Sequence, residues 1–151
     1  LDFGRPSRLV GSTCGSMGYG IPAAIAASII FPNKLVIGFV GDGGFMMSGL
    51  ELGTAIQHHA KPVIFIFNNQ NYGTIRMHQE KEYPNRVFGT DLVNPDFVNL
   101  ARSFGAFAIK VKKTNEFLPA VKKAINSQKL SVIELTVDKR QLSTRMNLND
   151  L

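Results

Sequence analysis

The sequence predicts an α/β fold: a three-layer, doubly wound, mostly parallel sheet with helices on both faces. Two observations support this. Short continuous apolar runs, such as residues 35–40 and 63–67, are typical of strands buried on both faces of a parallel sheet. Segments with helical spacing, each roughly 9–14 residues long, separate these runs, and that alternation implies right-handed crossover connections.

Five segments carry the spacing or the boundary signals of helices. Pro22 is tolerated in the first turn of the first helix. Asn94 is expected to cap the fourth, with Pro95 at its first helical position and Asp96 as the acid of its first turn. The predicted helices are residues 21–30, 48–59, 73–81, 94–104 and 114–127.

Four strands and two glycine-rich loops complete the pattern. The predicted strands are residues 35–40, 63–67, 106–111 and 131–137. Glycines punctuate residues 11–20, and the sequence Gly-Asp-Gly-Gly at residues 41–44 is expected to form a loop after the first strand. We expect one domain over residues 1–137. The polar tail, residues 138–151, is expected to cover its surface or to contact a partner.

Composition and charge narrow the class of protein. The 151 residues are 44% hydrophobic and 19% charged, as in folded domains. The net charge of +6 arises after residue 100, because residues 1–100 carry seven basic and seven acidic side chains and residues 101–151 carry ten and four. The basic tract has few aromatic residues beside it, so it predicts a solvated face and no nucleic-acid partner.

Location is indicated by the same composition. A single cysteine, Cys14, forms no internal disulfide and favours a reducing compartment, so the expected location is cytoplasmic. The longest apolar run, residues 21–31, is far shorter than the roughly 20 residues that span a bilayer, so no membrane partner is expected. Because the chain begins at Leu1 without Met, we expect it to be a piece of a longer protein.

Polar residues follow two predicted strands at the edge where parallel sheets bind ligands. Asp42 lies among glycines after the first strand, and Asn68 and Asn69 end the second. Glycines allow the backbone to approach an anion closely, whereas a carboxylate repels one. A carboxylate beside a diphosphate therefore requires a divalent cation between them, and Mg²⁺ prefers such oxygen ligands. The pattern predicts a metal–diphosphate site.

A simpler interpretation gives each motif a structural role alone. Asp42 would cap a helix, and Asn68 and Asn69 would form a turn. The spacing argues against this, because 24 residues separate Gly43 from Asn68. One helix and one strand fill that length and bring two neighbouring strand ends together.

The combined motif resembles a known family. Gly-Asp-Gly at residues 41–43, 24 intervening residues and Asn68-Asn69 resemble the cofactor-binding motif of thiamine diphosphate-dependent enzymes. The loop GSTCGSMGYGIPAAIAA, residues 11–27, is similar to the segment before that motif in the acetolactate synthase-like branch. The resemblance extends from about residue 15 to about residue 137, and it implies a C-terminal domain that binds thiamine diphosphate and Mg²⁺.

The resemblance assigns roles to individual residues. Asp42, the Asn69 side chain and the Asn71 backbone carbonyl would bind Mg²⁺. Met17 would support the bent cofactor, although it would also suit a gap in the core. The Gly15 carbonyl would accept a hydrogen bond from the aminopyrimidine. The cofactor-binding residues so implied are Gly15, Ser16, Met17, Asp42, Gly43, Gly44, Asn69, Asn71, Tyr72 and Gly73.

The resemblance also implies what this chain lacks. Family members use a glutamate from a separate N-terminal pyrimidine-binding domain, usually of a neighbouring subunit, and Glu51, Glu80 and Glu82 do not match it. We therefore expect no catalytic residue in this chain, weak cofactor binding and no turnover alone, and a homodimer or homotetramer. The expected substrate is a 2-oxo acid.

The same resemblance bears on the reaction. Tyr72-Gly73-Thr74-Ile75-Arg76 is closer to the Gly-x-x-Arg pattern of acetolactate synthase-like members than to the pattern of pyruvate decarboxylases, which have a glutamate shortly after the Asn-Asn pair. Carboligation is therefore favoured over decarboxylation, which stays an alternative. Arg76 would steer a substrate carboxylate or lie on an exposed helix face.

Two other functions compete with this interpretation. Residues 18–23 fit the G-x-G-x-x-A variant of a dinucleotide-binding loop, with Asp42 as the ribose ligand, but that loop requires a strand directly before it. A non-catalytic assembly module is the other. His58, His59 and His78 are weaker candidates for acid–base work, and Cys14 lacks an identifiable base.

Overall fold

The computed structural model describes residues 7–143 and 145–150, so residues 1–6, where the predicted domain begins, lie outside the described part. Four parallel strands form its central sheet in the order β1-β2-β4-β3. They are β1 (Ile37–Gly41), β2 (Val63–Asn68), β3 (Phe107–Val111) and β4 (Ser131–Thr136). The helices are α1 (Gly20–Ile30), α2 (Asp42–Ser48), α3 (Leu52–Gln57), α4 (Gly73–Glu82), α5 (Phe97–Ser103) and α6 (Thr114–Asn126), with 3₁₀ turns at Gly49–Glu51 and Leu148–Asp150.

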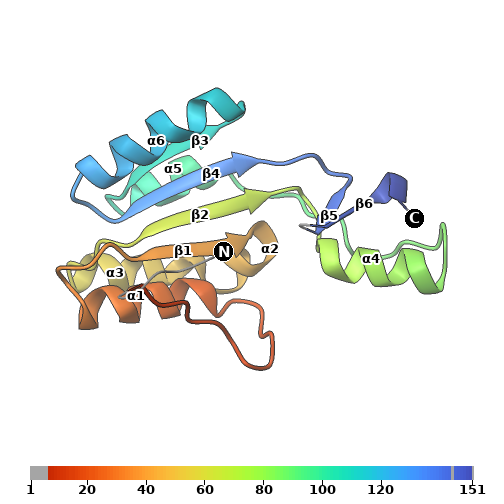
Figure 1. Cartoon of the computed structure of the whole chain (residues 1–151), viewed down its shortest axis with the longest axis horizontal. Helices are drawn as coiled ribbons and strands as arrows, with labels where there is room; N and C mark the ends of the chain where they lie inside the picture. The colour runs from red at the N-terminus through yellow and green to blue at the C-terminus, as the bar shows by residue number, and fades with distance from the viewer. Residues whose placement is uncertain (1–6, 144, 151) are drawn as a thin grey trace.

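Strand order explains how the helices divide between the two faces. The chain moves across the sheet from β1 to β2 to β3 and then returns to β4, which lies between β2 and β3. Because parallel crossovers are right-handed, the reversal puts α6 on the face opposite the earlier helices. Figure 1 shows α6 on one side of the sheet and α1 and α3 on the other. The predicted fold class is confirmed.

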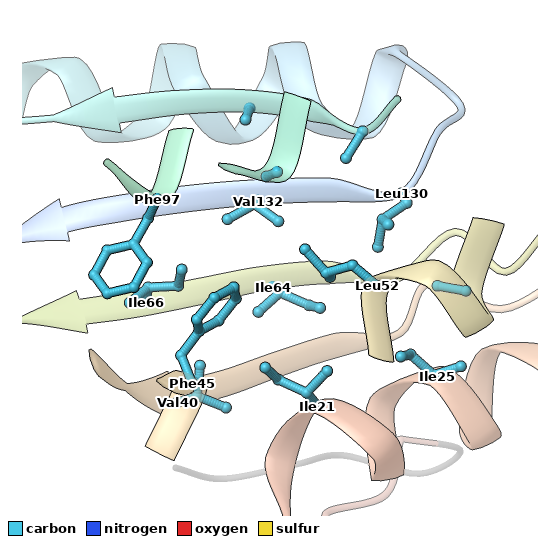
Figure 2. Close-up of a cluster of buried hydrophobic side chains, with 14 of the residues drawn as sticks. Ile21, Ile25, Val40, Phe45, Leu52, Ile64, Ile66, Phe97, Leu130 and Val132 are labelled. Atoms are coloured by element: carbon cyan, nitrogen blue, oxygen red, sulfur yellow. The ribbon is translucent and has the colours of Figure 1, made fainter. Parts of the chain in front are cut away.

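Two apolar clusters hold the layers together. The larger joins α1, α2, α3 and α5 to one sheet face, and Phe45 and Phe97 meet edge-on within it at 5.1 Å between ring centres. Figure 2 shows these two rings near the arrowheads of the strands, close to Ile66 and Val40. The smaller cluster packs Ala120 and other residues of α6 on the opposite face. The larger core therefore fixes the helices that begin beside the carboxyl ends of the strands.

The face covered by α6 is covered unevenly. Helix α6 packs on β3 and β4, and Phe117 reaches Phe65 of β2. Toward β1, Phe39 and Phe67 stay 54% and 42% exposed and lie 6.2 Å apart by ring centres. This part of the chain therefore has an apolar sheet surface that no described segment covers.

Most predicted boundaries shift by one or two residues, as for β1, which was predicted at residues 35–40, and three local predictions are wrong. Residues 41–44 do not form a loop, because α2 begins at Asp42, and the predicted helix 48–59 is divided into α2, a 3₁₀ turn and α3. Each helical glycine costs about 1 kcal/mol, but full burial of Phe45 compensates by fixing the helix against the sheet. Asp96, not Asn94, caps α5, with its carboxylate accepting from the Asn99 N–H at 2.9 Å.

The tail forms a small structure of its own. Strands β5 (Gln141–Ser143) and β6 (Met146–Asn147) pair in antiparallel fashion, with residue 144 outside the description. They lie beside α4 at the arrowhead end of the sheet (Figure 1). Within the described residues, no helix combines the length and the apolar character that crossing a membrane requires.

Candidate functional site

Asp42 is the buried centre of the candidate site. It directly follows β1 and is only 1% exposed. Its Oδ1 accepts from the Gly43 N–H at 3.0 Å, and its Oδ2 accepts from the Gln70 N–H at 2.8 Å. Gly41 and Phe67 are partners in the β1–β2 register, so the two strand ends meet at this edge. The predicted proximity of the two motifs is confirmed.

The turn after β2 depends on an unusual backbone conformation. Gln70 has a φ of +58°, a value that side chains other than glycine seldom adopt. This conformation directs its N–H at both Asp42 Oδ2 and Asn68 Oδ1, the latter at 3.2 Å. The hydrogen bonds to the two motifs stabilise the strained turn.

Asn94 belongs to the site, which sequence analysis missed. Its Nδ2 donates to Asp42 Oδ2 at 2.7 Å and to Asn68 Oδ1 at 3.0 Å. Its Oδ1 is buried and has no hydrogen-bond partner. Because Asn94 makes these buried contacts, Asp96, which was expected in the first turn, serves as the cap of α5.

The two other predicted metal ligands lie on the same turn. Asn69 Oδ1 accepts from the Asn71 N–H at 3.2 Å, and its Nδ2 donates to the Gln141 carbonyl of the tail at 2.8 Å. Asn71 is 3% exposed. In the amide orientation that gives both its oxygen and its nitrogen a partner, its side-chain nitrogen donates to Asp91 Oδ1 and to the Thr90 carbonyl.

Two glycines of the predicted site are required by close packing. A Cβ on Gly43 would lie 2.5 Å from Cε1 of Tyr72. One on Gly73 would overlap the Leu142 carbonyl oxygen and lie 3.2 Å from Nδ2 of Asn69. A Cβ on Gly44 would meet only the Gly18 nitrogen, at 3.7 Å. The glycines thus bring α2, the turn after β2 and the tail together.

The glycine loop lies against α2. Ser48 Oγ donates to the Gly18 carbonyl at 2.7 Å and anchors the loop. Gly15 and Gly18 have φ values of +68° and +80°, which explains glycine at both positions. Gly15, Ser16 and Met17 are exposed, and Met17 at 45% does not fill the core. The loop thus presents its predicted cofactor residues at the surface.

Other candidates are less well placed. The three histidines, His58, His59 and His78, are exposed. Arg76 is not an exposed helix residue, because its guanidinium lies 3.6 Å from Glu80 and 3.7 Å from Asp91, with 18% of its side chain exposed. No strand precedes Gly18 within residues 7–17, so the dinucleotide-binding interpretation is wrong.

The donor set fits a hard divalent cation. A carboxylate offers about four lone-pair positions, and three N–H donors occupy three of those on Asp42, leaving one on Oδ1. Asn69 Oδ1 likewise accepts a single hydrogen bond. The partnerless Asn94 Oδ1 adds a buried acceptor beside them. The described residues contain no cluster of three His, Cys, Asp or Glu, so a metal here would rely on amide and carbonyl oxygens as well.

Burial raises the pKa of Asp42 above its usual 3.8, although hydrogen bonds from Asn94, Gly43 and Gln70 oppose the shift. Between the two values the folded chain holds a proton that the unfolded chain has lost, so the free energy of unfolding should decline as pH rises through that window. A cation bound to Asp42 would compete with the same proton, so the affinity for Mg²⁺ should fall at pH values below the raised pKa of Asp42. Melting curves and Mg²⁺ titrations from about pH 3.5 to 7 test both trends, and D42N should flatten them. Identical pH profiles for both proteins would contradict this assignment.

Comparison with known proteins gives a consistent family. A model described as "Thiamine pyrophosphate enzyme, C-terminal TPP binding domain" matches residues 1–135. The mitochondrial acetolactate synthase catalytic subunit of Saccharomyces cerevisiae is 37% identical over 126 residues, covering 83% of this chain and 18% of that protein. The acetolactate synthase large subunit of Corynebacterium glutamicum is 40% identical over 130 residues, covering 82% and 21%.

A solved structure shares the fold. The thiamine diphosphate-dependent 4-hydroxybenzoylformate decarboxylase of Rhodococcus jostii RHA1 aligns with a TM-score of 0.78 and 32% sequence identity. The alignment covers 83% of this chain and 24% of that one. The chain spans about a fifth of the length of the acetolactate synthases it matches.

Proposed function

Because the chain belongs to the family of C-terminal thiamine pyrophosphate-binding domains, we propose that it is the Mg²⁺- and diphosphate-binding half of an acetolactate synthase-like active site acting on 2-oxo acids. One observation carries the proposal: Asp42, buried at the end of β1, meets the Asn68–Asn71 turn at the end of β2. These are the two strand ends where an open parallel sheet binds its ligand.

Each part of this chain has a defined task in the proposal. Asp42, the Asn69 side chain and the Asn71 carbonyl hold Mg²⁺, and the Mg²⁺ binds the diphosphate. The first turn of α2 supplies backbone N–H groups without helical partners, including that of Gly44. Gly15, Ser16 and Met17 hold the thiamine rings. When bound, the cofactor supplies the carbanion chemistry that cleaves or joins carbon–carbon bonds next to a carbonyl.

Exposed apolar side chains beside this site are evidence for a partner domain. Met46, Met47 and Leu50 follow the start of α2 and are 50%, 54% and 77% exposed. Phe39 and Phe67 add a second apolar surface on the sheet. Such exposure is typical of a surface that another domain covers. We propose that a pyrimidine-binding domain with the catalytic glutamate packs here, within a homodimer or homotetramer, and that this chain alone does not turn over substrate.

A simple 2-oxo acid decarboxylase is the second candidate. The structural neighbour from Rhodococcus jostii is named as a 4-hydroxybenzoylformate decarboxylase, which favours this reaction. The higher identity to acetolactate synthases and the Gly73-x-x-Arg76 sequence favour carboligation. Product analysis of the chain assembled with its proposed partner domain separates the two, because carboligation of two 2-oxo acids yields an acetohydroxy acid and CO₂, whereas decarboxylation yields an aldehyde and CO₂.

Cys14 is a natural probe of the proposed site, one residue before Gly15. Hydrogen bonds from Ser12 and Ser16 lower the pKa of this exposed thiol to about 7. Alkylation by iodoacetamide should therefore reach half its maximal rate near pH 7. Thiamine diphosphate with Mg²⁺ should slow alkylation about tenfold at ten times its Kd, because bound cofactor covers the loop.

Two controls make the alkylation test specific. Thiamine diphosphate with EDTA in place of Mg²⁺ should protect Cys14 little, since the proposed site holds the diphosphate through the metal. NAD at the same concentration should not protect it. Protection that does not depend on Mg²⁺, or equal protection by NAD, would contradict the proposed function.

A further inference from the structure

A line of hydrogen-bonded polar side chains crosses the sheet from the buried Asp42 to its far edge, where the Lys110 side chain is 42% exposed. Asn94 Nδ2 joins Asp42 to Asn68, as described above. Asn68 Nδ2 donates to Glu134 Oε1 on β4 at 2.8 Å, and Lys110 Nζ on β3 donates to the same oxygen at 2.7 Å. The line therefore includes a residue from each of the four strand ends or from the segment beside it.

The direction of each hydrogen bond follows from chemistry alone. Lys110 only donates and an ionised Glu134 only accepts, so Asn68 must turn its NH₂ group to Glu134. Its oxygen then faces Asn94 and accepts from Asn94 Nδ2. The second N–H of that amide is left to donate to Asp42. The charge pair at the far strands, together with the Gln70 N–H that donates to Asn68 Oδ1, thus keeps a donor, not an acceptor, facing Asp42.

Glu134 is costly where it lies. It is 1% exposed, on the sheet face where Val132, two residues earlier, belongs to the larger core. Its partner Lys110 keeps 42% of its side chain exposed, so the cost of burial falls on Glu134, and an apolar residue at such a buried position is often as stable as a buried charge or more so. The ion pair therefore calls for a role beyond packing, and its hydrogen-bonded path leads to the candidate metal site.

We propose that Glu134 and Lys110 are positioning residues of the metal site, acting through Asn68 and Asn94 to keep a hydrogen-bond donor on Asp42 Oδ2. This leaves the free lone pair of Asp42 on Oδ1, where a cation can bind. The inference rests on the proposed function, because it gives Asp42 the role of a Mg²⁺ ligand. Neither residue touches the metal or the cofactor.

The test exchanges the two charges. The double variant K110E/E134K keeps the composition and the ion pair but presents a donor to Asn68. The Asn68 amide must then reverse, and its NH₂ group opposes that of Asn94. The conservative variant E134Q retains an oxygen that accepts from both neighbours. D138N/R140Q is the matched control, because it removes an exposed ion pair with the same 2.7 Å separation.

Two readouts are recorded on the ¹⁵N-labelled chain. The first is the exchange rate and chemical shift of the Asn68 and Asn94 side-chain amides without ligand. The second is the Mg²⁺ dissociation constant at a fixed concentration of thiamine diphosphate, from NMR titration. We expect the charge exchange to release both amides and to weaken Mg²⁺ at least about tenfold, as for other groups that orient a metal ligand. E134Q and D138N/R140Q should match the wild type in both readouts.

A second variant covers the case in which the charge exchange prevents folding. K110M/E134M leaves no lone buried charge and removes the acceptor for Asn68, so it should also release the amides and weaken Mg²⁺. Unchanged Asn94 signals, or unchanged Mg²⁺ affinity in a folded variant, would overturn the inference alone. A wild-type chain that binds no Mg²⁺ with thiamine diphosphate would overturn the proposed function and the inference with it.

Discussion

Asp42→Asn should reduce Mg²⁺-dependent binding of thiamine diphosphate by at least about 100-fold. The substitution removes the one carboxylate of the proposed ligand set, and losing a group that only orients a metal ligand already costs about 10–100-fold. The fold should survive, because the asparagine oxygen can still accept from Gln70 and Asn94. NMR titration with cofactor, with and without Mg²⁺, measures the change even when binding is weak.

A matched aspartate separates this effect from a general change of charge. Asp96 is exposed and caps α5, and asparagine caps helices as well as aspartate does. Asp96→Asn should therefore leave both cofactor binding and the melting temperature close to those of the wild type. Full Mg²⁺-dependent binding by Asp42→Asn would exclude Asp42 as a metal ligand.

Phe97→Ala should have the largest effect on stability, about 3–5 kcal/mol lost from the free energy of unfolding. The side chain is fully buried and meets Phe45 edge-on, so its removal leaves a cavity where α2 and α5 join the sheet. Asn94 lies three residues before Phe97 and Asp42 three residues before Phe45. Loosening this pair should therefore also weaken the contact of Asn94 with Asp42.

Urea denaturation of Phe97→Ala and of a control, Phe88→Ala, measures the effect. Phe88 is 86% exposed, so its truncation should change the free energy of unfolding by about 0.5 kcal/mol or less. A loss below about 1 kcal/mol for Phe97→Ala would contradict the assignment of the Phe45–Phe97 contact as the support of the site.

The sheet was predictable from sequence because short apolar runs alternate with segments of helical spacing, although β1 is buried on one face only. β2 is apolar up to Phe67, β4 has apolar residues on either side of Glu134, and the bounds of both strands differ from the predicted ones by one residue each. The start of α2 was not predictable, because two glycines after Asp42 favour a loop locally. Only burial of Phe45 against Phe97, 52 residues away in the chain, makes that segment a helix.

The site, like the fold, was predictable only in part. Asp42 and Asn69 lie in a motif of defined spacing, so their strand ends were expected to meet. The roles of Asn94 and Glu134 depend on contacts with Asn68 across 26 and 66 residues. Each residue also has an ordinary local explanation, a helix cap for Asn94 and a charge in a strand for Glu134. No local sequence signal distinguishes a role in the site from these ordinary roles. The three-dimensional contacts do.

In the proposed function, Asp42 and Asn69 hold a divalent cation between the ends of β1 and β2. The most direct measurement is anomalous scattering from a crystal of the chain grown with thiamine diphosphate and Mn²⁺ in place of Mg²⁺. We expect one manganese peak bound by the Asp42 carboxylate, the Asn69 side-chain oxygen and the Asn71 carbonyl, with the diphosphate on its open side. A cofactor bound without metal at Asp42, or a manganese peak held by other residues, would contradict it.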